Sequence, residues 1–153
     1  MDLNHNYDAL WDESSAAEAE NGIFGPGPTR YSGAYAESEK ESRAVANFTR
    51  FCGFDLVMAF HSQGRVIYFD FNGLEPPRSK LIGEAFERVS PYVLERAEGI
   101  SSFGGYKDWF IQQYNCPGYT VELGCGKNPL PIEQFDEIYR ETLSVLLLAA
   151  QLG

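Results

Sequence analysis

The sequence predicts an α/β fold in which helices pack against a sheet. Segments with strand character alternate along the chain with segments whose apolar residues recur at helical spacing, and this alternation is typical of layered α/β domains. The chain has 153 residues, 44% of them hydrophobic and 22% charged. These values fit one globular domain with one core, so we expect a single domain over residues 1–153.

Three segments have strand character. The run Phe54–Phe60 is almost continuously apolar, which predicts a strand that is buried on both faces. The segment Arg65–Phe71 alternates and is rich in aromatic residues, and Tyr119–Leu123 is a short β-branched and aromatic segment. We expect these segments to form a mixed sheet with flanking helices.

Four segments have helical character, and one long segment has no periodicity. Helices are predicted after Ser38 and up to Gly53, from Pro76 or Pro77 up to Pro91, over Lys107–Tyr114, and from near Pro131 to the C-terminal region. The apolar stripes expected to face the core are Val45, Phe48 and Cys52 in the first helix, Leu81, Ala85, Phe86 and Val89 in the second, and Phe135, Ile138, Thr142, Val145, Leu146 and Ala149 in the last. The stretch 11–37 is predicted to be a long loop.

Composition argues against several classes of protein. The net charge of −10 and the sequence pI near 4.6 leave no basic patch for nucleic acid or for an anionic membrane surface. The longest apolar run, Val145–Ala150, is too short to span a bilayer. The segment Met1–Tyr7 lacks the features of a signal peptide, so a cytoplasmic, reducing location is the default expectation.

Two residues stand out as candidates for chemistry. His61 follows the apolar strand at its C-terminal end, where ligands and catalytic groups collect in α/β sheets, although a lone histidine is more often structural. Glu122 lies between Val121 and Leu123 in a predicted strand, so its side chain points to the face opposite theirs. Either the face that carries this carboxylate is solvated, or the carboxylate works as a general base.

Other catalytic patterns are not supported. Ser62 lies in no G-x-S-x-G sequence and has no second histidine nearby to serve as its base. The glycine-rich segments do not follow the phosphate-binding loop pattern. The three cysteines form no C-x-x-C pair, which argues against a disulfide framework or a cysteine zinc site.

Five segments together resemble the zinc carboxypeptidase family. Asp2–Asp8 resembles its D-x-N-R-N segment, and the strand ends at His61 and Glu122 resemble those carrying its third zinc ligand and its catalytic glutamate. The segments occur in the same order as in the family. Their residues most resemble those of the branch that cleaves γ-D-glutamyl–diamino-acid bonds of bacterial peptidoglycan. The five are Asp2–Asp8, Ser38–Glu39, Phe60–Gly64, Gly104–Phe110 and Tyr119–Gly124.

The resemblance implies a fold, a mechanism and site residues. The fold would be the C-terminal half of the zinc carboxypeptidase fold. Zinc would polarise the scissile carbonyl and acidify a bound water, with His61 as one metal ligand and Glu122 as the catalytic base. Asn4 and His5 would bind the carboxylate end of a peptidoglycan-derived peptide.

The sequence also departs from the family pattern. The H-x-x-E motif that carries the first two zinc ligands lies upstream of the first matching segment in the family, and it is absent from these 153 residues, together with the upstream arginine that stabilises the oxyanion. His5 stands where many members have an arginine, and the mobile tyrosine of the pancreatic type would fall near Ile100. A neutral imidazole cannot form a bidentate clamp on a carboxylate.

These departures lead to three hypotheses. The first is a truncated carboxypeptidase-like domain that is weak or inactive alone and holds zinc weakly or not at all. The second is half of a split enzyme that a complementing N-terminal half completes. The third is a non-catalytic module that binds a cell-wall peptide. Because Phe54–Phe60 would then lie at an uncovered sheet edge, we also expect a homo-oligomer or a partner polypeptide.

Overall fold

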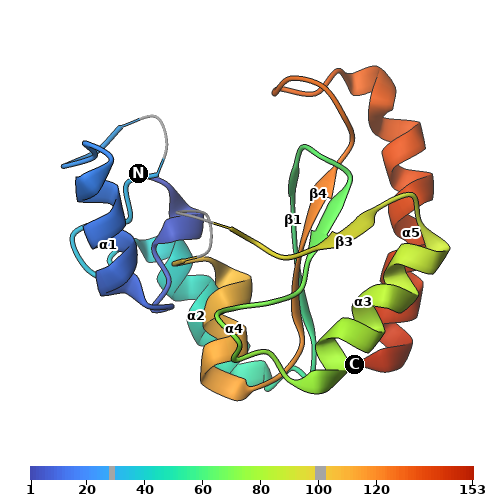
Figure 1. Ribbon diagram of the computed structural model, residues 1–153, viewed down its shortest axis with the longest axis horizontal. Helices are drawn as coiled ribbons and strands as arrows, with labels where there is room; N and C mark the ends of the chain where they lie inside the picture. The colour runs from blue at the N-terminus through green and yellow to red at the C-terminus, as the bar shows by residue number, and fades with distance from the viewer. Residues whose placement is uncertain (28–29, 99–102) are drawn as a thin grey trace.

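A mixed four-stranded sheet forms the centre of the structure, a computed structural model that describes residues 1–27, 30–98 and 103–153 (Figure 1). The strand order is β1-β4-β2-β3. Strand β4 pairs in parallel with β1 and antiparallel with β2, and β2 pairs in parallel with β3. The strands are β1 (Val57–Ser62), β2 (Val66–Tyr68), β3 (Val93–Glu95) and β4 (Gly118–Leu123).

Helices lie on both sides of this sheet. In Figure 1, α3 and α5 cover one side, and α1, α2 and α4 gather on the other with the N-terminal segment. The helices are α1 (Trp11–Glu20), α2 (Lys40–Cys52), α3 (Pro77–Val89), α4 (Tyr106–Tyr114) and α5 (Phe135–Leu152), with short 3-10 helices η1 (Leu3–His5) and η3 (Ile132–Gln134). The predicted α/β class is therefore confirmed.

Two clusters of buried side chains form the core. One lies between the sheet and the helices α3 and α5, and the other joins α2 and α4 to the N-terminal segment. The first consists of Ile67, Phe69, Phe86, Tyr92, Tyr119, Val121, Val145 and Ala149, and the second of Tyr7, Ala9, Ala46, Val57, Phe71, Trp109, Phe110 and Ile111. In the described residues, no helix combines the length and apolarity needed to cross a membrane.

The expected loop over residues 11–37 is wrong for its first part, because α1 occupies Trp11–Glu20. Its sequence has no amphipathic stripe. Two polar side chains of the helix, Ser14 and Glu18, are buried, and Glu18 ties the helix to a distant segment. The carboxylate of Glu18 accepts hydrogen bonds from the backbone N–H and the hydroxyl of Ser32, both at 3.0 Å. A contact between segments distant in sequence thus stabilises a helix that periodicity does not predict.

The expected inward stripe of α2 is also wrong. Val45, Phe48 and Cys52 face outwards, with Val45 42% and Phe48 59% exposed. The buried positions of this helix are Ser42, Ala46 and Thr49. The helix is amphipathic as predicted, but its apolar side is turned away from the core of the described residues. The stripes expected for α3 and α5 are wrong in part, since Leu81, Val89, Phe135 and Leu146 are exposed.

Strand β1 is shorter and more exposed than predicted. It begins at Val57 rather than Phe54, and it lies at an end of the sheet, with β4 as its strand partner among the described residues. Phe54 and Phe60 are each 39% exposed. The strand is therefore not buried on both faces, and one row of its backbone groups lacks a ladder partner within residues 1–27, 30–98 and 103–153.

Candidate functional site

One face of the sheet carries polar side chains. His61 lies opposite Glu122 in the β1–β4 pairing, Thr120 lies opposite Tyr68 in the β4–β2 pairing, and Tyr68 lies opposite Glu95 in the β2–β3 pairing. Residues that pair directly across strands point to the same face. The opposite face carries Val121 and Ile67, which are buried in the core beside α3 and α5. The alternation of β4 therefore separates a core face from a polar face.

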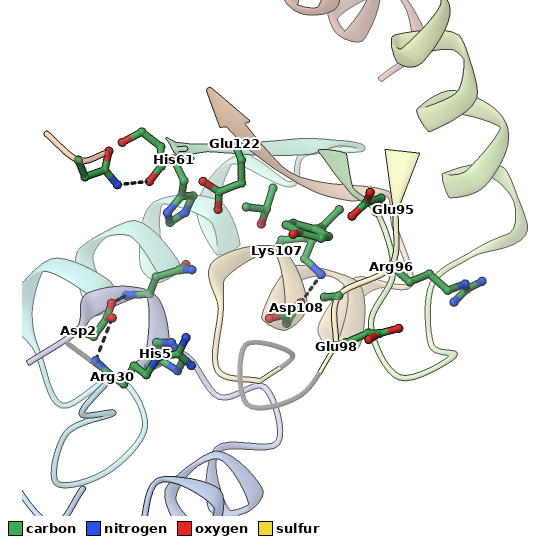
Figure 2. A pocket seen from close by; sticks show the side chains of 16 residues that line it. Asp2, His5, Arg30, His61, Glu95, Arg96, Glu98, Lys107, Asp108 and Glu122 are labelled. Carbon is green, nitrogen blue, oxygen red and sulfur yellow. Dashed lines mark hydrogen bonds and ion pairs between the residues drawn. The ribbon is translucent and has the colours of Figure 1, made fainter. Parts of the chain in front are cut away.

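The polar face borders a cavity of about 920 Å³ (Figure 2). All four residues singled out from the sequence line it: Asn4, His5, His61 and Glu122. The fold therefore brings η1, at the N-terminal end of the chain, to the strand ends of β1 and β4. The other lining residues are Asp2, Arg30, Ser62, Tyr68, Glu95, Arg96, Ala97, Glu98, Lys107, Asp108, Thr120 and Asn128.

The carboxyl group of Glu122 has the electrostatic properties of a proton acceptor. Burial raises its pKa above the usual value of 4.5, and the nearby His61 partly offsets this shift. Burial also raises the pKa of Tyr68, to which the charges of Glu95 and Glu122 contribute. The Tyr68 phenol therefore stays protonated in the vicinity of these two carboxylates.

Asn4 is held in place by its neighbours. The Asn4 backbone N–H donates to Asp2 Oδ1 at 3.2 Å, and the Tyr106 backbone N–H donates to Asn4 Oδ1 at 3.2 Å. Because the side-chain oxygen already has this partner, the amide NH₂ of Asn4 is the group that remains for a ligand in the cavity. Gly104 makes this arrangement possible, since a Cβ added there would lie 2.7 Å from the carbonyl oxygen of His5.

His5 is buried and faces a carboxylate. Its Nδ1 lies 4.0 Å from Glu18 Oε1, and neither of these two buried atoms has a hydrogen-bond partner in the described parts of the chain. The second oxygen of Glu18 is occupied by Ser32. The imidazole thus directs one nitrogen towards α1, and this leaves one nitrogen for the cavity.

Asn6 connects this segment to the start of α2. Its Nδ2 donates to the carbonyl oxygens of Ser32 (2.7 Å) and Tyr35 (3.1 Å), and to Ser38 Oγ (3.0 Å). Its Oδ1 accepts from the backbone N–H of Glu39 at 3.1 Å. A fully buried amide with this many partners organises the surrounding backbone rather than a ligand.

Lys107 and Asp108 line the cavity but are engaged with each other. Both are buried, and they form an ion pair. Lys107 Nζ also donates to the carbonyl oxygen of Asp70, and the Gly105 backbone N–H donates to Asp108 Oδ2 at 3.2 Å. These contacts fix the first turn of α4 against the sheet.

The donor set of the described residues does not by itself fit a zinc ion. No group of three or more His, Cys, Asp or Glu residues that could hold a metal occurs within the described ranges. His61 and Glu122 supply one imidazole and one carboxylate side by side, whereas protein zinc sites use three or four protein ligands. The position near Ile100, where the family's mobile tyrosine would fall, lies outside the described residues.

Sequence reasoning missed several residues of the cavity. Strand alternation does put Thr120 on the face of Glu122, although it did not single Thr120 out as a site residue, and Tyr68 lies opposite Thr120 on β2. Glu95 lies on β3, which was not predicted because the strand has only three residues. Arg30 gave no signal, because it lies in an aperiodic segment and reaches the cavity through tertiary contacts.

Comparison with known proteins matches the chain to one family and to two longer relatives. A family profile described as zinc carboxypeptidase matches residues 1–145. The chain is 47% identical over 147 residues to gamma-D-glutamyl-L-diamino acid endopeptidase 1 of Lysinibacillus sphaericus, covering 96% of this chain and 36% of that protein. It is 36% identical over 146 residues to the uncharacterized protein YqgT of Bacillus subtilis (strain 168), covering 95% of this chain and 38% of that protein. The chain thus spans little more than a third of the length of these relatives.

Solved structures agree at the level of the fold. Bovine thrombin-activatable fibrinolysis inhibitor, in complex with tick carboxypeptidase inhibitor, superposes with a TM-score of 0.71 at 22% identity, over 97% of this chain and 55% of that one. Carboxypeptidase A from Helicoverpa armigera superposes with a TM-score of 0.67 at 20% identity, over 97% of this chain and 41% of that one. The predicted fold family is confirmed by these neighbours.

Proposed function

Because the chain belongs to the zinc carboxypeptidase family, we propose that it supplies the base-bearing and substrate-binding side of a metallopeptidase active site. The proposed substrates are peptides of peptidoglycan that contain a γ-D-glutamyl–diamino-acid bond. The 47% identity to an endopeptidase named for that bond supports this substrate class. The single observation that carries the proposal is the meeting of Glu122, His61, Asn4 and His5 around one cavity.

In this proposal Glu122 is the general base. Its raised pKa makes it a stronger proton acceptor than an exposed glutamate. It would take a proton from the attacking water and deliver it to the leaving amine. Its place on the polar face of β4 keeps the carboxylate at the cavity while Val121 anchors the strand in the core.

His61 would be one zinc ligand. Since the described residues supply one imidazole at this point, at least two further ligands would come from a second polypeptide region, such as a complementing half or a second copy of the chain. When bound, zinc would polarise the scissile carbonyl and lower the pKa of a water molecule. Asn4 and His5 would bind the carboxylate end of the peptide on the other side of the cavity.

The exposed apolar surface favours a polypeptide partner. Val45, Phe48 and Phe51 face outwards on α2, where Phe51 is 89% exposed. The ring of Phe48 meets that of Phe54 edge to face at 5.7 Å between centroids, just before the edge of β1 that has no strand partner among the described residues. We infer that a second polypeptide region covers this surface, either a complementing carboxypeptidase half or a second copy of the chain. Peptide binding without catalysis is the alternative if no such region is supplied.

The test is the Glu122→Gln variant, made in the form of the enzyme that carries an H-x-x-E segment, whether in one polypeptide or in a mixture of two. Hydrolysis of a γ-D-glutamyl-L-lysine peptide should fall by about 10²–10⁴-fold, the usual contribution of a general base. The matched control is Glu133→Gln, an exposed glutamate of η3 outside the cavity. Rates within a few-fold of the unmodified enzyme would contradict the assignment of Glu122.

A further inference from the structure

The cavity has two chemically different sides. The carboxylates of Glu95, Glu98 and Glu122 belong to the sheet and the segment after β3, whereas Arg30 and His5 come from the N-terminal part of the chain. Figure 2 shows Arg30, His5 and Asp2 towards one end of the cavity, and Glu95 and Arg96 towards the other. Arg96 and Lys107 are already paired with carboxylates. Arg30 is therefore the cation of the lining that the described residues leave for a negatively charged ligand group.

Asp2 positions Arg30 relative to Asn4. One oxygen of its carboxylate, Oδ2, accepts from the Arg30 backbone N–H at 3.1 Å, and the other, Oδ1, accepts from the Asn4 backbone N–H at 3.2 Å. Arg30 has a left-handed backbone with φ of 67°. A non-glycine residue is uncommon in this conformation and persists when its surroundings hold it there. A single side chain thus couples the backbone of Arg30 to a proposed substrate-binding residue.

The guanidinium of Arg30 has a buried nitrogen at the cavity. Arg96, the other arginine that lines the cavity, is paired with Asp70 and Glu75. Arg30 forms no ion pair among the described residues, and its Nη1 is buried without a hydrogen-bond partner there. A buried donor without an acceptor is costly, and a ligand carboxylate in the cavity would supply the acceptor.

His5 is unsuited to bind a carboxylate by itself. One of its ring nitrogens faces Glu18, so it offers a single nitrogen to the cavity. A guanidinium presents parallel N–H groups that match both oxygens of a carboxylate. We propose that Arg30 is the specificity-determining cation that binds a carboxylate of the peptide substrate, with Asn4 as a neighbouring donor. The inference rests on the proposed function and adds a residue from a different segment to it.

Two carboxylates of a γ-D-glutamyl–diamino-acid peptide could serve as this ligand group. One is the free α-carboxylate of the D-glutamyl residue, and the other is the C-terminal carboxylate of the diamino acid. Both share the chemistry that a guanidinium recognises. Peptides in which one or the other is converted to a carboxamide distinguish them, since an amide keeps the shape and loses the charge.

Peptide binding to the 153-residue chain, measured by NMR titration, tests the proposal without relying on catalysis. The probes are L-alanyl-γ-D-glutamyl-L-lysine and its two single carboxamides. For Arg30→Gln the dissociation constant of the free acid should rise about tenfold to a hundredfold, as for loss of a charge-assisted pair. For Arg30→Lys the dissociation constant should rise less than for Arg30→Gln, because lysine keeps the positive charge but lacks the planar guanidinium that binds both carboxylate oxygens. Arg43→Gln, at an exposed position of α2, is the matched control and should bind as the unmodified chain does.

Each outcome decides the question. If one carboxamide binds the unmodified chain as weakly as the free acid binds Arg30→Gln, the carboxylate that Arg30 recognises is identified. If the preference for the acid over both amides persists in Arg30→Gln, the inference is overturned while the proposed function stands. If the unmodified chain binds none of the three peptides, both are overturned. A thermal melt of each variant shows whether it is folded, and Arg30→Lys provides the comparison if Arg30→Gln is not.

Discussion

Glu122 lies directly opposite His61 in the parallel pairing of β4 with β1, and its carboxyl group is half-buried at the border of the cavity. Neighbouring strands of a sheet bring opposed side chains to within about 5 Å between Cβ atoms. The pairing therefore fixes a basic nitrogen and a carboxylate side by side without help from any loop. It also means that the charge on Glu122 affects the stability of the sheet.

The first prediction concerns the pH dependence of stability. Since burial raises the pKa of Glu122 above 4.5, its contribution is fully present below that pH and is lost as the pH rises through the raised value. Glu122→Gln removes this loss, so its melting temperature relative to the unmodified chain should increase between about pH 4 and about pH 8. Thermal melts across this range measure the difference, with Glu133→Gln as the exposed control. A difference that stays flat with pH would mean that the Glu122 carboxylate is well solvated.

The second prediction concerns metal. With one imidazole beside one carboxylate at the candidate site, the 153-residue chain should retain well under one zinc per molecule after dialysis. In the form that carries an H-x-x-E segment, His61→Ala should lower zinc affinity, whereas His5→Ala should not. Elemental analysis and competition with a chelator measure both quantities. Tight, stoichiometric zinc in the chain alone would contradict the incomplete site, unless two copies share ligands.

The third prediction concerns the close approach of two backbone segments. Gly104 has φ of 75°, and an added Cβ would lie 2.7 Å from the carbonyl oxygen of His5. Gly73 has nearly the same φ, 76°, but an added Cβ there meets nothing within 4 Å. Both alanine variants should lose about 1–2 kcal/mol through backbone strain, and Gly104→Ala should lose at least about 1 kcal/mol more through the clash. Denaturant unfolding gives both values, and equal losses would show that the η1 segment moves aside freely.

The fourth prediction concerns association. The outward apolar side of α2 and the open edge of β1 should make the isolated chain dimerise or form larger oligomers at micromolar concentration. The double variant Phe48→Ser/Phe51→Ser should shift this equilibrium towards the monomer. Leu81→Ser, at a position of α3 that is 66% exposed, is the control on another surface. Light scattering measures the mass, and a monomeric unmodified chain would rule out self-association through this surface.

The sequence predicts the existence of most elements, but not the direction in which each apolar side faces. The helix α2 illustrates this: its periodicity is clear, yet Val45 and Phe48 face outwards and Ala46 and Thr49 face the core. Periodicity shows that a helix has two different sides and is silent about which one meets the sheet. The sequence of α1 has no helical hydrophobic periodicity at all. That helix is held in place by hydrogen bonds between the buried polar groups of Glu18 and Ser32.

The sequence also singled out residues that lie together in the fold, although their roles stay predictions. Motif resemblance singled out Asn4, His5, His61 and Glu122, and all four line one cavity. Arg30 could not be predicted, because its position depends on a hydrogen bond from its backbone N–H to Asp2, a residue distant in sequence. Residues that a motif carries can be found from sequence, whereas those placed by contacts between distant segments need the folded chain.

The two-sided character of β4 has a consequence for how this chain tolerates change. Tyr119 and Val121 are fully buried in the core, while Thr120 and Glu122 face the cavity. In a library of all single substitutions, protein abundance should fall at the first pair and ligand binding at the second. The two phenotypes would then alternate residue by residue along one strand. Evolutionary drift along β4 would meet a different selective pressure at each step, one from folding and the next from the ligand.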